Sequence, residues 1–247
     1  MNTYQLWHTF DDLFAQTLLH PQYFLKVGDM RCLEILSKVI KGSFLDIGCG
    51  RQWYRNKIQK YVTKYFALDH PHLSKKYQSK FPIELLADVT DIPLDSGTID
   101  AALMLWVLEH LSNPYKALRE IKRVLKPSGI LIICTVENYP PHGFPPNYFR
   151  FTNSGLRQIL KESGFRIRNI ECFGNFWETQ VVFQNVYLMK IVKSLTDSKT
   201  TFVLGLLLLI FFAPIMISGN IFAILLGRRK ISEEFALGHI VVARNSL

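Results

Sequence analysis

The stretch FLDIGCG, Phe44 to Gly50, constrains the fold of this chain more than any other segment. An apolar run that ends beside an acidic residue and opens into Gly-x-Gly is typical of a buried parallel strand and a tight turn, at which Gly48 and Gly50 let the backbone approach a ligand. A helix predicted from Arg51 would point its first amides at that ligand. Trp53 stands where the dinucleotide fingerprint has its third glycine, which disfavours NAD. A strand-to-helix turn without a ligand is the alternative.

Acidic residues follow two further apolar segments. Asp69 closes the run Tyr65 to Leu68 at about 20 residues beyond the glycine turn, where nucleotide-binding sheets place a carboxylate for ribose hydroxyls. Asp88 ends the next predicted strand, and a helix predicted from Pro114 to Leu125 precedes the apolar strand LKPSGILIICTV. This alternation predicts an α/β, doubly wound sheet, whose ligands bind beyond the carboxyl ends of its strands.

In this order, FLDIGCG, Asp69, ADVTDIPL, VLEHL and RVLKPSGILII resemble the small-molecule, type 11-like branch of the class I S-adenosylmethionine-dependent methyltransferases. The resemblance covers Ser43 to Phe173. It implies a Rossmann-like methyltransferase sheet, mostly parallel with an antiparallel last strand, and S-adenosylmethionine as the cofactor. In that family the glycine turn carries the methionine part, the acidic residue after strand two holds the ribose, and the Asp of the third loop reaches the adenine. The cofactor-binding residues that it implies here are Asp46, Gly48, Cys49, Gly50, Asp69 and Asp88.

A second informative segment, Thr201 to Gly227, carries no charged residue. A continuous helix of that length would extend about 40 Å and could span a hydrocarbon core of about 30 Å. Pro214 and the cluster Ser218 to Asn220 interrupt the run, and basic residues flank both ends, which the positive-inside rule draws toward the cytoplasm. We therefore expect a bent hairpin that enters a membrane without crossing it. A buried hairpin that covers the domain or a dimer partner is the alternative.

The tail Ala236 to Asn245 has a β-branched run and looks like the final methyltransferase strand, antiparallel beside the strand at Phe165 to Phe173. If it returns to the sheet, the residues between form an insertion, whose first part mixes aromatic and polar side chains as an interfacial helix does. The sequence then divides into an N-terminal helical segment (1–42), an S-adenosylmethionine-binding methyltransferase core (43–173), an amphipathic and hydrophobic membrane-associated insertion (174–235) and the returning last strand (236–247).

The net charge of +9 is uneven, because Arg51 to Lys80 holds eight basic residues and one acidic residue. Such a basic face could meet anionic lipid headgroups, a phosphorylated substrate or nucleic acid, or it could be a solvated helix surface. No RNA-binding motif accompanies it, so nucleic acid is not the expected partner. The four scattered cysteines favour reduced, cytosolic thiols, and the first residues lack the basic region of a secretory signal.

Candidate acceptor-side residues follow the predicted fourth and fifth strands. The Pro- and aromatic-rich stretch Glu137 to Thr152 predicts a rigid loop over the site, and it resembles a loop of methyltransferases found among polysaccharide-modifying enzymes. His110 and His142 are the candidate bases for a hydroxyl acceptor, with helix capping and solvent exposure as their respective alternatives. Arg150 could hold an anionic group of the acceptor. The histidines show no metal-ligand spacing.

These patterns predict a methyltransferase at the cytoplasmic face of a membrane, acting on a small or lipid-linked acceptor such as a glycan intermediate. A cofactor-binding or scaffolding protein without turnover is the first alternative, and the three acidic cofactor residues argue against it. A nucleotide-sugar or NAD-dependent enzyme is the second, disfavoured by GCGRQW and by the lack of a Tyr-x-x-x-Lys pair. The acceptor and the oligomeric state are left open.

Overall fold

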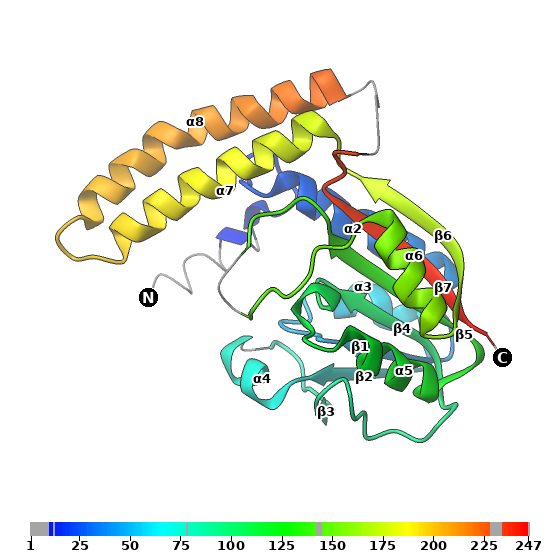
Figure 1. The fold of residues 1–247 in the computed structure, drawn as a ribbon. Coiled ribbons are helices and arrows are strands. Elements are labelled where there is room, and N and C mark those ends of the chain that lie inside the picture. The colour runs from blue at the N-terminus through cyan, green and yellow to red at the C-terminus, as the bar shows by residue number, and fades with distance from the viewer. Residues whose placement is uncertain (1–9, 12, 78, 142–144, 228–233, 247) are drawn as a thin grey trace. The chain divides into compact units, whose positions relative to one another are not determined.

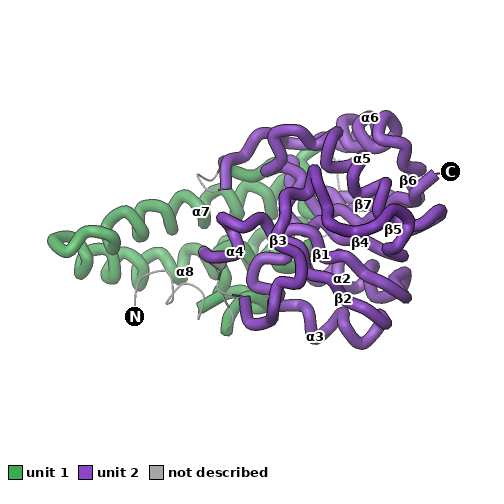
Figure 2. Tube along the Cα trace, turned by 90° about the horizontal axis from the view of Figure 1, so that it is seen from below, with its two compact units in different colours: residues 1–28, 138–140, 173–237 green, residues 29–137, 141–172, 238–247 purple. Residues whose placement is uncertain are grey.

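The computed structural model describes residues 10–11, 13–77, 79–141, 145–227 and 234–246. The chain divides into two compact units, which Figure 2 colours separately. The sheet unit comprises residues 29–137, 141–172 and 238–247, and the hairpin unit comprises residues 1–28, 138–140 and 173–237. Of the predicted N-terminal helical segment, 1–42, residues 1–9 and 12 lie outside the described part of the chain, and the helix α2, Tyr23–Val39, lies within it.

One seven-stranded sheet has the order β3-β2-β1-β4-β5-β7-β6 (Figure 1). Parallel pairing joins β1 to β2 and β4, β2 to β3, and β4 to β5. The order reverses between β1 and β4, and this switch point opens a crevice beyond the carboxyl ends of the strands. The strands are β1 Ser43–Ile47, β2 Lys64–Asp69, β3 Leu85–Leu86, β4 Ile99–Leu105, β5 Leu125–Val136, β6 Phe165–Phe173 and β7 Gly238–Asn245.

The last strand confirms the predicted return of the chain to the sheet. β7 pairs antiparallel with β5, from Ile130 opposite Arg244 to Val136 opposite Gly238, and lies between β5 and β6. Its residues Ile240 and Val241 are 1% and 0% exposed, because the strand is covered on both faces. The sheet is therefore doubly wound and mostly parallel, with an antiparallel last strand, as the sequence predicts.

Helices cover the sheet with their apolar faces. In α5, Pro114 occupies the first turn and the Asn113 side chain accepts a hydrogen bond from the Lys116 amide, so the helix begins with a satisfied cap. Its buried residues recur at helical spacing and join one core with β1, β4 and β5. The α-helices numbered in Figure 1 are α2 Tyr23–Val39, α3 Arg55–Ile58, α4 Pro71–Tyr77, α5 Pro114–Val124, α6 Asn153–Glu162, α7 Phe176–Thr196 and α8 Phe202–Gly227.

Arg55, on the predicted basic face, has a structural role. Arg55 is only 8% exposed and places its guanidinium Nη2 2.7 Å from Glu84 Oε1. The same guanidinium lies over the Tyr65 ring, 4.6 Å from its centroid. Arg55 thus ties α3 to the segment before β3 and is not available to an external phosphate.

The insertion differs from the predicted bent hairpin. The apolar run forms one continuous helix, α8, which includes Pro214 and pairs with α7 to make a helical hairpin (Figure 1). Gly205 allows the two helices to approach closely near their turn, since a Cβ there would lie 2.6 Å from Thr196 Cγ2 on α7. Packing against α7 stabilises α8 across the proline. The prediction that Pro214 and the cluster Ser218 to Asn220 bend the segment is therefore wrong, because the helix continues through both.

Two buried asparagines fix the hairpin within its unit. The Nδ2 atom of Asn185, on α7, donates to Asn220 Oδ1 on α8 at 3.2 Å, and Asn220 Nδ2 donates to the Leu18 carbonyl at 2.8 Å. Both side chains are 0% exposed. Asn220, which the sequence places in the predicted bend, therefore hydrogen-bonds α8 to α7 and to the N-terminal segment.

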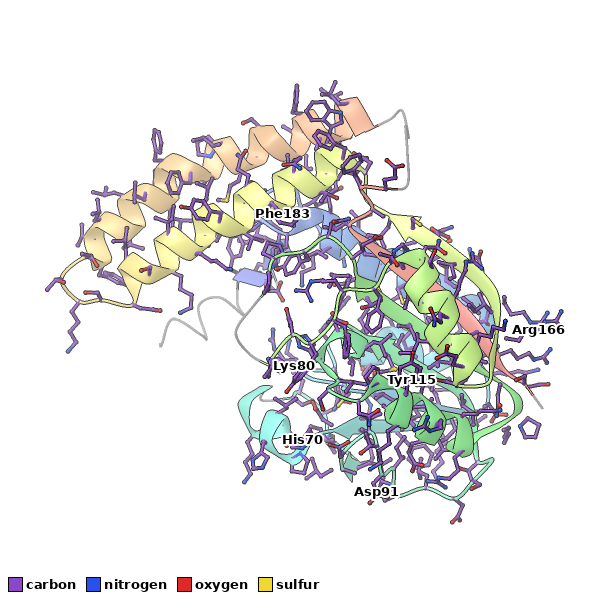
Figure 3. All side chains as sticks on the ribbon, viewed as in Figure 1. His70, Lys80, Asp91, Tyr115, Arg166 and Phe183 are labelled. Carbon is purple, nitrogen blue, oxygen red and sulfur yellow. The ribbon has the colours of Figure 1, made fainter. Side chains whose placement is uncertain are left out.

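Most of α8 presents apolar side chains to the surface (Figure 3). In the described part of the chain, α8 is the one helix long and apolar enough to cross a membrane by length and composition. Its 26 residues correspond to a length of about 39 Å. The large apolar residues at least half exposed on it are Val203, Leu207, Ile210, Phe211, Phe222 and Leu225.

Candidate active site

The glycine turn after β1 is shaped by two different constraints. Gly48 has φ +66°, and a Cβ on it would meet Val107 Cγ2 at 2.5 Å. Gly50 has φ +49°, and a Cβ on it would meet nothing within 4 Å. The Gly48 amide donates to the Leu68 carbonyl at 2.8 Å, which anchors the turn to β2. Gly48 therefore serves packing, whereas Gly50 leaves open space at the wall of a cavity.

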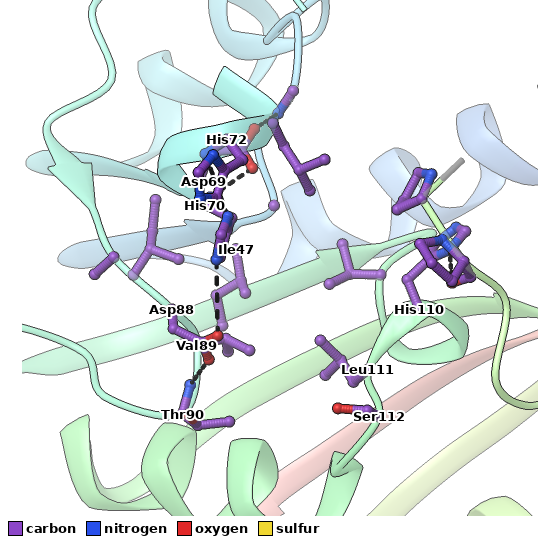
Figure 4. A pocket seen from close by; sticks show the side chains of 18 of the residues that line it. Ile47, Asp69, His70, His72, Asp88, Val89, Thr90, His110, Leu111 and Ser112 are labelled. Atoms are coloured by element: carbon purple, nitrogen blue, oxygen red, sulfur yellow. Dashed lines mark hydrogen bonds and ion pairs between the residues drawn. The ribbon is translucent and has the colours of Figure 1, made fainter. Parts of the chain in front are cut away.

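That cavity, of about 640 Å³, lies at the carboxyl ends of β1, β2 and β4 (Figure 4). Its size is within the range of small-molecule and cofactor sites, about 300 to 1,000 Å³. Four of the predicted cofactor residues line it, and so does one of the predicted catalytic residues. These are Gly48, Gly50, Asp69, Asp88 and His110.

Asp69 places a buried carboxylate on the cavity wall. It is 2% exposed, and its oxygens accept hydrogen bonds from the Gly50 amide at 3.1 Å and the His70 amide at 2.8 Å. Burial raises the pKa of this carboxyl, and the two amide hydrogen bonds oppose that shift. Since each carboxylate oxygen has a second lone pair, Asp69 can still accept from a ribose hydroxyl.

Asp88 lies on the same wall and is more exposed. Its Oδ1 accepts from the Thr90 amide at 2.8 Å, and its Oδ2 lies 4.0 Å from His70 Nε2. Partial burial raises the pKa of this carboxyl, but the Thr90 hydrogen bonds outweigh it and the pKa is lowered. The neighbouring Val89 is buried and gives the cavity an apolar surface suited to an aromatic base.

Asp46 and Cys49, also predicted as cofactor contacts, are not among the residues that line the cavity. The Asp46 carboxylate is fully buried and accepts from the hydroxyls of Tyr54 at 2.7 Å and Tyr65 at 2.5 Å. Burial raises its pKa to about 6. Cys49 is 3% exposed, and burial raises the pKa of its thiol. Alternation along β1 turns Asp46 away from the ligand side, so it fixes the turn from behind.

His110 lines the opposite part of the cavity, in a short 3₁₀ helix, η2 Leu108–His110. Its Nδ1 lies 2.9 Å from the Pro146 carbonyl oxygen and 2.9 Å from Asn147 Nδ2. Burial lowers its pKa, so the ring is neutral near pH 7. With a proton on Nδ1 donated to the Pro146 carbonyl, the lone pair on Nε2 is the one that can accept a proton.

Neither of the other two predicted acceptor-side residues, His142 and Arg150, is among the described residues that line the cavity. His142 lies outside the described residues. Arg150 does not line the cavity: its Nη2 donates to Asn147 Oδ1 at 2.6 Å and its Nη1 to the Phe149 carbonyl at 2.9 Å. Arg150 thus binds within its own loop, whereas the sequence predicts that it holds an anionic group of the acceptor.

Sequence reasoning missed the contribution of Trp106. Trp106 lines the cavity with φ +59°, a conformation that is strained for an aromatic residue, and its Nε1 donates to Asp29 Oδ1 at 2.5 Å. A non-glycine residue with positive φ leaves no sequence signal, so this feature could not have been predicted.

Glu109 supports the acceptor side from within the core. It is 1% exposed and accepts from the Thr135 hydroxyl at 2.9 Å, while its carbonyl accepts from the Tyr148 amide at 2.9 Å. Burial raises its pKa to about 7. The residue before His110 therefore anchors the loop that covers this part of the cavity.

The described residues include no group of three or more His, Cys, Asp or Glu side chains that could hold a metal ion. The arrangement offers instead a carboxylate, an open glycine turn and apolar walls at one part of the cavity, and a neutral imidazole at another. These features fit a nucleoside-bearing cofactor placed next to an acceptor.

Comparison with known proteins identifies a methyltransferase domain in this chain. Residues 45–133 match the methyltransferase domain family. A demethylmenaquinone methyltransferase of Chlamydia muridarum is 37% identical over 102 residues, covering 36% of this chain and 43% of its own. A tRNA U34 carboxymethyltransferase of Campylobacter jejuni is 27% identical over 176 residues, covering 63% of this chain and 59% of its own. The chain thus spans about half the length of the curated relatives it matches.

Solved structures show the same fold. An S-adenosylmethionine-dependent methyltransferase from Mesorhizobium loti superposes with a TM-score of 0.54 at 14% identity, covering 88% of this chain and 97% of its own. The strand order, the glycine turn and the acidic residue after β2 agree with S-adenosylmethionine as the cofactor. Residues 45–133 therefore carry a methyltransferase domain, in a fold similar to that of S-adenosylmethionine-dependent methyltransferases.

Proposed function

We propose that this protein transfers a methyl group from S-adenosylmethionine to a small or lipid-linked acceptor, such as a glycan intermediate, at the cytoplasmic face of a membrane. The observation that carries the proposal is the shared cavity, in which Gly50 and Asp69 occupy one part of the wall and His110 another. When bound, the cofactor supplies an electrophilic methyl group on its sulfonium.

Three residues of this chain form the part of the cavity that would hold the cofactor. Asp69 would accept hydrogen bonds from ribose hydroxyls, Gly50 would leave room for the methionine portion next to the turn, and Val89 would offer an apolar surface to the adenine. Trp106 and Val107 line the same cavity and exclude water from its centre.

The acceptor part is arranged for a hydroxyl or similar group. The His110 imidazole, neutral near pH 7 because burial lowers its pKa, takes the proton that the acceptor loses. The Pro146 carbonyl, which accepts the hydrogen bond from His110 Nδ1, keeps the ring in place. Positioning of the acceptor contributes further, because an oriented pair of reactants reaches effective molarities of about 10⁵ to 10⁸ M.

Support for a membrane comes from α8, with 26 uncharged residues and apolar side chains exposed along its length. Basic residues follow it in sequence, Arg228 to Lys230, and Lys199 precedes it, which favours the cytoplasmic side for both ends. The chlamydial relative is named for demethylmenaquinone, which supports a small acceptor. The Campylobacter relative is named for tRNA, so RNA is the competing acceptor class.

The decisive experiment offers the full chain S-adenosylmethionine labelled in its methyl group together with a lipid extract, an aqueous small-molecule extract or total tRNA. We expect label in the lipid or small-molecule pool, and less label with His110→Gln although cofactor binding is retained. Label in tRNA alone would contradict the proposed acceptor class. Cofactor binding without label in any pool would favour the non-catalytic alternative.

Membrane association is tested separately by vesicle flotation with anionic phospholipid. We expect the full chain to float, and the double variant Leu207→Lys and Phe211→Lys to remain in the dense fraction. Both side chains are more than half exposed, so the replacements leave the core of the hairpin unit intact. Labelling of Ser246→Cys from outside intact cells would contradict a cytoplasmic tail.

A further inference from the structure

A cysteine, a histidine and a glutamate meet at the edge of the sheet formed by β5, β7 and β6. Cys172 is the last residue but one of β6, His239 is the second residue of β7, and Glu137 directly follows β5. Because β7 runs antiparallel between its two neighbours, its start lies beside their ends. None of these residues lines the cofactor cavity.

The distances place the three side chains in a defined order. His239 Nδ1 lies 3.4 Å from Cys172 Sγ, and His239 Nε2 lies 2.6 Å from Glu137 Oε2. The histidine side chain is 1% exposed, so its partners are those that the fold provides. The two partners are on opposite ring nitrogens, which is the order of a nucleophile, a base and a group that orients the base.

The ring nitrogens have different roles for a chemical reason. A carboxylate accepts hydrogen bonds and does not donate them, so Glu137 fixes a proton on His239 Nε2. The lone pair of Nδ1 then faces the Cys172 thiol and can take its proton. The result is a thiolate beside an imidazolium whose charge is balanced by Glu137.

Other polar groups near the thiol are compatible with a thiolate. Asn153 Nδ2, from α6, lies 3.9 Å from Cys172 Sγ and donates toward it. The Asn153 Oδ1 accepts from Arg157 Nε at 2.7 Å, which orients the amide. The preceding acidic residue on β6, Glu171, is paired with Arg31 at 2.7 Å. The negative charge next in sequence to the thiol is thus neutralised.

Cys172 is more exposed to solvent than the other three cysteines. Cys32, Cys49 and Cys134 are between 0% and 3% exposed, whereas Cys172 is half-buried. Burial raises the pKa of the Cys49 and Cys134 thiols. A small reagent in water should therefore meet one reactive thiol.

We propose that Cys172 is a nucleophilic thiolate and a modification site for peroxides and other small electrophiles. With hydrogen peroxide, the Cys172 sulfur attacks one oxygen, the S–O bond forms and the O–O bond breaks. The departing hydroxide takes the proton from His239 Nδ1 and leaves as water. The sulfur is oxidised by two electrons to a sulfenic acid, the peroxide is reduced, and His239 returns to its neutral form.

The test measures alkylation of the full chain by iodoacetamide, and oxidation by hydrogen peroxide, with each cysteine followed by peptide mass spectrometry. At pH 7 we expect Cys172 to be alkylated at least about tenfold faster than in the variant His239→Gln, because an unassisted thiol is only a few per cent thiolate at that pH. The variant Glu137→Gln should fall between the two. Peroxide should yield sulfenic acid at Cys172 before the other cysteines react.

A second pH separates reactivity from folding. At pH 10 an ordinary thiol is ionised, so wild type and His239→Gln should alkylate at rates within about twofold of each other. Equal rates at pH 7, or a gap that persists at pH 10, would overturn the proposal. Alkylation of Cys49 as fast as that of Cys172 would overturn it as well.

Discussion

Replacement of Gly48 or Gly50 by alanine should affect different properties: mainly stability for Gly48 and mainly cofactor affinity for Gly50. In Gly48→Ala the added Cβ meets Val107 Cγ2 at 2.5 Å and the residue keeps φ +66°. A left-handed conformation costs an alanine about 1 to 2 kcal/mol, and overpacking costs about 1 to 3 kcal/mol. The sum is a loss of stability of about 2 to 5 kcal/mol. In Gly50→Ala only the conformational part applies, about 1 to 2 kcal/mol.

Affinity for S-adenosylhomocysteine should fall more in Gly50→Ala than in Gly48→Ala, the opposite of the order expected for stability. The Cβ of Gly50→Ala projects into the open part of the cavity wall, where the account places the cofactor, so we expect a loss of about tenfold, equivalent to about 1.4 kcal/mol. Chemical denaturation gives the stability of each variant and titration calorimetry gives its affinity. Equal affinity of Gly50→Ala and wild type would refute the assignment of the open space to the cofactor.

Three further results are expected. Asp69→Asn should lose about 1.5 to 3 kcal/mol of S-adenosylhomocysteine affinity in calorimetry, whereas Asp46→Asn, whose side chain faces two tyrosines, should bind within about threefold of wild type. Because burial raises the Asp46 pKa from 3.8 to about 6, the folded protein holds this proton more tightly than the unfolded chain. The contribution of Asp46 to the unfolding free energy should therefore be greatest below about pH 4 and fall by up to about 3 kcal/mol by about pH 6, so the difference in stability between wild type and Asp46→Asn should change by that amount over this range in pH-dependent denaturation. His110→Gln should lower the rate of methyl transfer by about 10² to 10⁴ with unchanged cofactor affinity, and an undiminished rate would assign catalysis to proximity alone.

Much of the sheet could be predicted because each strand carries its own signal. β1, β4 and β5 are apolar runs bounded by glycine or acidic turns, and the β-branched residues of β7 identify a strand far from the others in sequence. The position of Asp69 and Gly50 at one cavity could be predicted because strand ends and glycine turns meet at one edge of a parallel sheet.

The predicted residues that do not line the cavity share a physical cause, namely that cavity lining depends on which way a side chain points. Asp46 precedes the turn by two residues, yet its carboxylate faces Tyr54 and Tyr65, which sequence spacing does not reveal. Arg150 is taken up by Asn147 within its own loop. Asn220 reads as a helix breaker in sequence but hydrogen-bonds across the hairpin, because tertiary packing overrides local propensity.

The most direct test of the account is a crystal structure of the full chain with S-adenosylhomocysteine. The account predicts ribose hydroxyls within hydrogen-bond distance of the Asp69 carboxylate, the homocysteine portion against Gly50, and His110 facing the sulfur side of the ligand across the cavity. Density for the ligand elsewhere, or a ribose held by Asp46 in place of Asp69, would contradict it.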